Sequence, residues 1–91
     1  MAELKQGSNT FYLETNGERK AEISFTRQDE SLIIDSTYVS EELRGKGTGR
    51  ELVHNVVELA RAENKTIIPK CSYAEKVLKE TSKYHDVLEP L

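Results

Sequence analysis

Apolar and polar residues alternate along the first half of the chain with the period of a β-strand. Residues 11–14 alternate in this way, and Asn16-Gly17 then supplies a strong short-range signal for a hairpin turn. Residues 21–26 alternate again after that turn. Residues 32–39 form the third predicted strand, and its run of leading apolar residues is typical of a strand covered on both faces. The short turns between these segments predict a three-stranded antiparallel meander.

The second half of the chain changes to the period of a helix. From Gly49 onward apolar residues recur at helical spacing, namely Leu52, Val53, Val56, Val57, Leu59 and Ala60. We expect this helix to stop near Asn64 and a short strand to follow over residues 65–69, so that the crossover is right-handed and its strands are parallel. A second helical pattern begins after Cys71 and ends before Tyr84. The predicted fold class is α+β, with a mostly antiparallel sheet, one parallel β-α-β crossover and a C-terminal helix.

The length of the chain limits the kind of site that it can form. Its 91 residues support a single domain, residues 1–91, and the core must be thin because only 36% of the residues are apolar. A deep internal site is not expected in so short a domain. We therefore expect a ligand to bind in a groove between elements, where backbone groups do much of the binding.

The charge balance argues against a nucleic acid as the main partner. The formal net charge is −3, whereas binding a polyanion requires a surplus of Lys and Arg on one face. Arg44, Lys46 and Arg50 form a basic island, since they fall within seven residues that contain no acid. A small basic island in an acidic chain favours a small anionic ligand.

Other features of the sequence narrow the chemistry and the compartment. Cys71 is the only cysteine, which excludes an intramolecular disulfide, and His54 and His85 are too few and too scattered for a metal site. The first ten residues lack the apolar run of a signal peptide, and no stretch approaches the ~18 apolar residues that span a bilayer. We therefore expect a cytoplasmic protein that uses no metal and no membrane.

Three glycines, Gly45, Gly47 and Gly49, occupy alternate positions where the third strand leads into the helix. The first turn of a helix leaves N–H groups unpaired and carries partial positive charge, which suits a phosphate. Glycines remove side chains that would hold an anion away from these N–H groups, and the basic island adds charged donors at the rim. The loop therefore favours a pyrophosphate, although its spacing matches neither the Walker loop nor the dinucleotide-binding fingerprint.

Within this loop, Arg44-x-x-Gly47-x-Gly49 resembles the pyrophosphate-binding motif of the GNAT acetyltransferases, Gln/Arg-x-x-Gly-x-Gly/Ala. The context is also similar, because a predicted strand precedes the motif, a Leu/Val-rich helix follows it, and a later strand ends in Pro69-Lys70-Cys71-Ser72. Over roughly residues 11–88 the chain resembles the minimal, single-domain GNAT-like proteins.

The resemblance implies a site for acetyl-coenzyme A. It places the pantetheine arm between two splayed parallel strands, beside the backbone of Tyr38 and Val39. It places the pyrophosphate on the loop, against Arg44, Gly45, Lys46, Gly47, Thr48, Gly49 and Arg50.

The same resemblance makes Cys71 the candidate catalytic residue, since similar minimal proteins carry a cysteine at this position close to the acetyl group. Its thiol is either a nucleophile or part of the acetyl pocket, and the alternative is a small buried apolar residue. Asp35 is a candidate base or a residue that pairs across the sheet. Ser36 stands where relatives of this type often carry a histidine.

The resemblance thus implies an N-acetyltransferase that moves an acetyl group from acetyl-coenzyme A to an amine. The acceptor could be a protein lysine, a protein N-terminus or a small amine such as a polyamine. A non-catalytic module that binds or senses acyl-coenzyme A is the alternative. We expect a monomer or a weak dimer.

Overall fold

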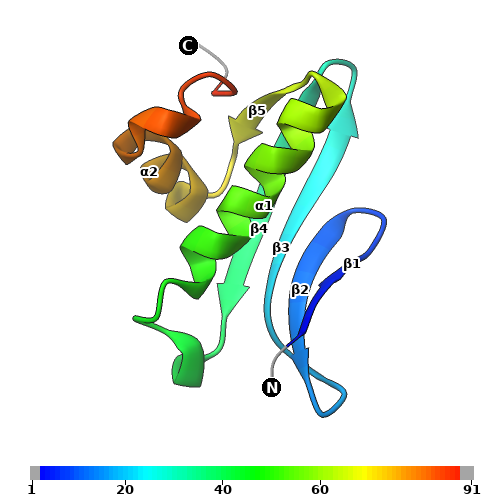
Figure 1. Ribbon diagram of the computed structural model, residues 1–91, viewed down its shortest axis with the longest axis vertical. Helices are drawn as coiled ribbons and strands as arrows, with labels where there is room; N and C mark the ends of the chain where they lie inside the picture. Colours follow the sequence, from blue (N-terminus) through cyan, green and yellow to red (C-terminus); the bar gives the residue numbers. More distant parts are fainter. Residues whose placement is uncertain (1–2, 89–91) are drawn as a thin grey trace.

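The computed structural model describes residues 3–88, which form one five-stranded sheet and two helices packed against it (Figure 1). The strands lie in the order of the sequence: β1 Glu3–Gln6, β2 Thr10–Thr15, β3 Glu18–Gln28, β4 Ser31–Val39 and β5 Thr66–Pro69. The helices are α1 Thr48–Glu63 and α2 Ser72–Glu80, and two 3-10 turns, η1 Glu41–Leu43 and η2 Ser82–Tyr84, flank them.

The predicted α+β class is confirmed by the pairing of the strands. Strands β1 to β4 pair antiparallel, whereas β4 and β5 pair parallel across the α1 crossover. Asn16 and Gly17 both have positive φ in the hairpin turn, at 52° and 79°, as a tight hairpin of this sequence requires. The sheet thus contains the predicted meander and the predicted parallel crossover.

Strand β1 was not predicted, because its segment is polar. Leu4 is its only apolar residue and is 44% exposed, so burial contributes little to this strand. Its ladder with β2 runs from Glu3 opposite Glu14 to Gln6 opposite Phe11. Lys5 pairs diagonally across that ladder with Glu14, with 2.7 Å between Nζ and Oε1. Pairing with β2, rather than an apolar face of its own, therefore makes this segment a strand.

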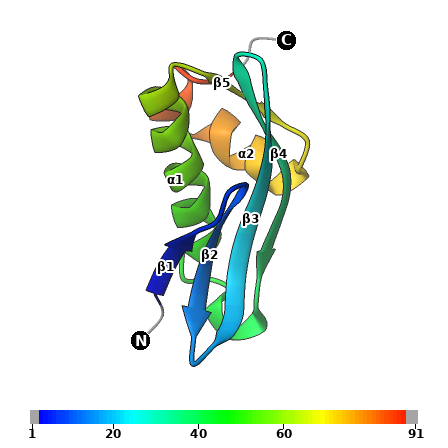
Figure 2. The ribbon, with the colours of Figure 1, turned by 90° about the vertical axis from the view of Figure 1, so that its right-hand side faces the viewer.

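The core lies between the sheet and the helices (Figure 2). The apolar side of α1 packs into this core. Its fully buried residues are Leu52, Val53, Val56, Val57 and Ala60. Helix α2 contacts α1, β4 and β5 and adds Ala74, Val77 and Leu78 to the same core. Helix α1 ends at Glu63, close to the predicted end near Asn64, because Asn64 is its C-cap and takes the left-handed conformation with φ 56°. No helix within residues 3–88 combines the length and the apolar character needed to span a membrane.

Strand β4 divides into two halves with different surroundings. Its first half, Ser31 to Ile34, pairs with β3 on one side and with β5 on the other. The N–H groups of Lys70 and Cys71 then both approach the Ile34 carbonyl, at 3.0 and 3.3 Å, and the chain turns away into α2. Residues 35–39 are called the open half of β4 below, and within residues 3–88 their only neighbouring strand is β3.

A β-bulge marks the boundary between the two halves of β4. Ser24 lies opposite Ser36 and Phe25 lies opposite Ile34, so Asp35 is an extra residue in the ladder. The Thr26 hydroxyl donates a 2.7 Å hydrogen bond to Oδ2 of Asp35. Of the two roles considered for Asp35, the structure therefore shows pairing across the sheet.

Candidate functional site

The open half of β4 presents backbone groups along an edge that β5 does not cover. Backbone groups of successive strand residues point to opposite sides. The Ser40 N–H donates to the Lys20 carbonyl of β3 at 2.8 Å, so the groups of Val39 and Thr37 point away from β3. The Arg44 side chain confirms this direction, because its Nε donates to the Val39 carbonyl at 3.0 Å. Thr37 and Val39 therefore offer the backbone contacts that were predicted for Tyr38 and Val39.

A cleft of about 560 Å³ lies between the open half of β4, the glycine loop and the first turn of α1. Every residue predicted for the cofactor lines it except Lys46. Thr37, Leu43 and Tyr73 complete the wall, and none of the three was predicted as a cofactor residue. The cleft thus joins a strand edge to a helix N-terminus, as expected for a small domain that binds through its backbone.

The glycine loop is shaped by two residues in the left-handed conformation. Gly45 has φ 79° and Gly47 has φ 81°, values that side-chain-bearing residues rarely adopt. Among residues 3–88, no heavy atom other than those of the glycine and its two chain neighbours lies within 4 Å of the position that a Cβ would take at either glycine. Gly47 is also the N-cap of α1 and provides no capping side chain, so first-turn N–H groups remain available to an anion. The loop therefore fits a pyrophosphate.

Gly49 has a different role from the other two glycines, because it makes room for a tyrosine. A Cβ at Gly49 would lie 2.7 Å from Oη of Tyr73 and 2.8 Å from two of its ring carbons. Tyr73 belongs to α2, is 39% exposed and forms part of the cleft wall. Gly49 and Tyr73 lie on different helices, and nothing in a local sequence pattern indicates that they touch.

Ion pairs hold the η1 turn, which precedes the glycine loop, against β3. Lys20 contacts both Glu18 and Glu42, and its Nζ lies 2.6 Å from Oε1 of Glu42 in η1. The hydrogen bonds to Glu18 and Glu42 raise the pKa of Lys20 above its usual range. The Glu42 carboxylate therefore pairs with a residue of β3 and not with the basic island.

Cys71 lies next to the cleft, at the N-terminus of α2. It is half-buried, and its Sγ is 3.5 Å from Oγ1 of Thr37, a residue of the cleft wall. Burial raises the pKa of the Cys71 thiol, but the backbone N–H of Ala74 and the Thr37 hydroxyl, with further backbone groups, outweigh it. The pKa is therefore below the usual cysteine value, as expected for a thiolate at a helix N-terminus.

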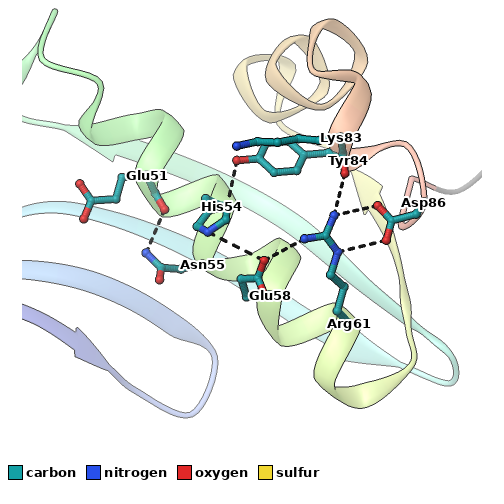
Figure 3. Close-up of polar contacts among 8 residues, drawn as sticks. All are labelled: Glu51, His54, Asn55, Glu58, Arg61, Lys83, Tyr84 and Asp86. Carbon is teal, nitrogen blue, oxygen red and sulfur yellow. Dashed lines mark hydrogen bonds and ion pairs between the residues drawn. The ribbon is translucent and has the colours of Figure 1, made fainter.

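The two histidines contact groups of the protein itself. His54 Nδ1 lies 3.0 Å from the Tyr84 hydroxyl, and His85 Nε2 lies 3.0 Å from the Lys79 carbonyl. The contact between His54 and Tyr84 joins residues that lie thirty positions apart in the sequence (Figure 3). Within residues 3–88 no cluster of three or more His, Cys, Asp or Glu side chains could hold a metal ion.

Comparison with known proteins gives the chain a family. The family model described as GCN5-related N-acetyl-transferase matches residues 10–87. A GCN5-like N-acetyltransferase candidate from Staphylococcus aureus is 42% identical, with a TM-score of 0.82, over 98% of this chain and 89% of that one. No match was found among curated proteins.

More distant structures share the fold. The ribosomal-protein-S18-alanine N-acetyltransferase from Escherichia coli is 16% identical with a TM-score of 0.66, and the match covers 82% of this chain and 53% of that one. N-acetylglutamate synthase from Neisseria gonorrhoeae, complexed with coenzyme A and N-acetyl-glutamate, is 15% identical with a TM-score of 0.66, over 87% of this chain and 22% of that one. From the family match and the 42% identity to the staphylococcal protein, the chain belongs to the GCN5-related N-acetyltransferase family.

Proposed function

We propose that this chain transfers an acetyl group from acetyl-coenzyme A to an amine, with the coenzyme bound along the cleft between the open half of β4 and the glycine loop. The observation that supports this proposal most directly is the composition of the cleft, in which a free strand edge runs into a helix N-terminus. An extended amide-containing chain can pair with such an edge, and a pyrophosphate suits such a helix N-terminus.

The loop would hold the pyrophosphate through backbone N–H groups at Gly47 and in the first turn of α1. Arg44 and Arg50 line the same part of the cleft and would neutralise its charge. Lys46 lies in the loop but not in the cleft wall, so we assign it a contact at the outer rim. Tyr73, held against Gly49, would limit how far the coenzyme can move toward α2.

The backbone of Thr37 and Val39 would pair with the pantetheine arm and direct its reactive end toward Ile34. A thioester already carries an activated acetyl group. This chain's part is to hold the acetyl carbonyl and the amine together, and to aim a backbone N–H of β4 at the oxygen on which charge develops.

Cys71 is the side chain best placed to act at that end of the cleft. Its thiol contacts Thr37, and its lowered pKa raises the fraction of thiolate at neutral pH. We assign Cys71 as the nucleophile. Its sulfur would form a bond to the acetyl carbon as the bond from that carbon to the coenzyme sulfur breaks, and an amine would then displace Cys71 and lose a proton to solvent.

The surroundings of the cleft favour an acceptor that approaches from outside. Tyr38 lines the cleft and is 50% exposed, which makes it one of the most exposed large apolar residues. Asp35, the bulge residue, and Ser36 next to it are also exposed. An accessible site of this kind suits an amine on a protein surface or a small free amine.

Binding should be tested with a pair of matched glycine variants. Gly47→Val and Gly17→Val both place a β-branched residue at positive φ in open space, with φ 81° and 79° in the wild type. The strain should cost each variant about 1–3 kcal/mol of stability. Isothermal titration should show one site per chain in the wild type and in Gly17→Val, and a loss of at least about tenfold in affinity in Gly47→Val. Equal affinity in both variants would refute the pyrophosphate assignment.

Turnover should be tested by following coenzyme A release with and without an amine. An acetyltransferase releases it in an amine-dependent way, whereas a non-catalytic binding module does not. Mass spectrometry should find an acetyl group on Cys71 of the wild type when amine is withheld. Full turnover by Cys71→Ala would instead assign the thiol to the wall of the acetyl pocket.

A further inference from the structure

Strand β1 leaves one edge of the sheet without a neighbour. It is the first strand in the order β1 to β5, and within residues 3–88 it pairs only with β2. Figure 1 shows β1 at the outer margin of the sheet, whereas α2 contacts β4 and β5 at the opposite margin. The free edge of a sheet offers a row of backbone N–H and C=O groups to another strand. The edge of β1 is therefore a place where the sheet can be extended.

The hydrogen bonds of the first hairpin show which residues of β1 have backbone groups on this free edge. The Gly7 N–H donates to the Thr10 carbonyl at 2.9 Å, so the backbone groups of Gly7 point toward β2. Along an antiparallel ladder these groups point toward and away from the partner strand in turn. Those of Lys5 therefore point toward β2, whereas those of Leu4 and Gln6 point outward. A further strand must bond to β1 through Leu4 and Gln6.

The side chains of β1 divide between the two faces of the sheet. Leu4 lies opposite Leu13, which packs against the core, and yet Leu4 is 44% exposed. Glu3 and Lys5 point to the other face, where Glu3 lies directly opposite Glu14. Like charges directly opposite each other on neighbouring strands are destabilising, and within residues 3–88 Glu3 forms no ion pair. The edge thus carries an exposed apolar side chain and a carboxylate that lacks an ion-pair partner.

We propose that two copies of this chain associate through β1, antiparallel and with Leu4 opposite Leu4 of the second copy, so that their sheets become continuous. The two Leu4 residues exchange both backbone hydrogen bonds, which makes the contact symmetric. In this register Glu3 of each copy lies opposite Lys5 of the other, and Leu4 and Leu13 of both copies form one apolar row. A shift by one residue would use backbone groups that point toward β2. A shift by two would place Lys5 opposite Lys5, which like-charge repulsion disfavours.

Analytical ultracentrifugation of the wild type and of Glu3→Lys tests this contact. A strand this short predicts a weak, transient dimer, so the average mass of the wild type should rise toward twice the chain mass between about 10 µM and 1 mM. Glu3→Lys sets like charges opposite Lys5 and should weaken association at least about tenfold. Within its own chain the new lysine faces Glu14, so thermal unfolding at low concentration should show an equal or higher Tm. Loss of association would then not come from loss of the fold.

A pair of complementary variants tests the register. Lys5→Glu should also stay monomeric, but a mixture of Glu3→Lys and Lys5→Glu restores opposite charges at both positions and should associate about as tightly as the wild type. Glu75→Lys is the matched control, because it makes the same charge change at a half-exposed residue of α2, away from β1. It should associate like the wild type.

Three results would overturn the proposal. A wild type that stays monomeric throughout this range would exclude the dimer. Association that is unchanged in Glu3→Lys would exclude β1 as the contact. A mixture of the two variants that stays monomeric would exclude the antiparallel register. None of the described residues of β1 lines the cleft, so each of these results leaves the proposed function standing.

Discussion

The two halves of β4 belong to one strand but meet different surroundings. In the first half, Leu32 and Ile34 are fully buried, and strands flank them on both sides. In the open half, Asp35, Ser36 and Tyr38 are exposed, and β3 is the only neighbouring strand in the described part of the chain. The change occurs within one residue, at the bulge. A single strand thus supplies the core at one end and a binding edge at the other.

This contrast arises because β5 is short. It consists of Thr66 to Pro69, and proline cannot donate a hydrogen bond to extend the ladder. The chain beyond it enters α2 with Cys71 as the N-cap. The end of the parallel pairing therefore creates both the free edge and the position of the thiol.

The largest expected effect comes from the paired half. Ile34→Ala removes a fully buried side chain and should lower the free energy of unfolding by about 2–5 kcal/mol. Val39→Ala, in the open half, is the control and should cost clearly less, because Val39 is only partly buried. Chemical denaturation of both variants measures the difference. Equal losses would contradict the division of β4 into a core half and a binding half.

A smaller effect is expected at the contact between Gly49 and Tyr73. Gly49→Ala should displace the Tyr73 ring from the cleft, since its Cβ would lie 2.7 Å from Oη. Affinity for coenzyme A should fall about threefold to tenfold, while alanine in a helix adds up to about 1 kcal/mol of stability.

The same contact can be isolated with a double-mutant cycle. Tyr73→Ala alone should weaken binding as much as Gly49→Ala alone. The double variant should bind no more weakly than either single variant, because each substitution by itself already removes the packing of the Tyr73 ring against Gly49. Additive losses in titrations of the three variants would show that Gly49 acts separately from Tyr73.

The smallest effect concerns the pKa of Cys71. Thr37→Val removes a hydroxyl that lowers this pKa, so the alkylation rate of Cys71 by iodoacetamide should reach its midpoint at a higher pH in the variant than in the wild type. Because the folded-state pKa is lowered, the thiolate adds stability above the pKa of the unfolded cysteine, and this contribution is lost as the pH falls through the folded-state value. Identical midpoints would show that the Thr37 hydroxyl does not lower the pKa of Cys71.

Local patterns predicted most of the fold. The alternation in β2 to β4, the Asn16-Gly17 turn and the apolar stripe of α1 each follow from interactions among near neighbours. Strand β1 was missed because its stability comes from a partner strand and not from its own apolar residues. The bulge at Asp35 was missed for a similar reason, since it exists only relative to β3.

In the candidate site too, the local motif could be predicted from the sequence and the long-range contacts could not. The glycine loop carries its own signal in the spacing of its residues, and the structure places almost all of it on the cleft wall. Contacts between distant segments carry no such signal. Tyr73 against Gly49, Thr37 beside Cys71 and Tyr84 on His54 each join residues that only the folded chain brings together.

The unequal lengths of β4 and β5 also have a geometric consequence. The open half spans residues 35–39, which at 3.3 Å per residue is roughly 16 Å. The anionic end of a ligand is held at the glycine loop. The length of the open half therefore sets the distance between that anionic end and the end of the ligand that reacts. Extending β5 by one residue would shorten the open half by one residue. The number of residues in a strand can therefore determine which bond of a bound molecule reacts.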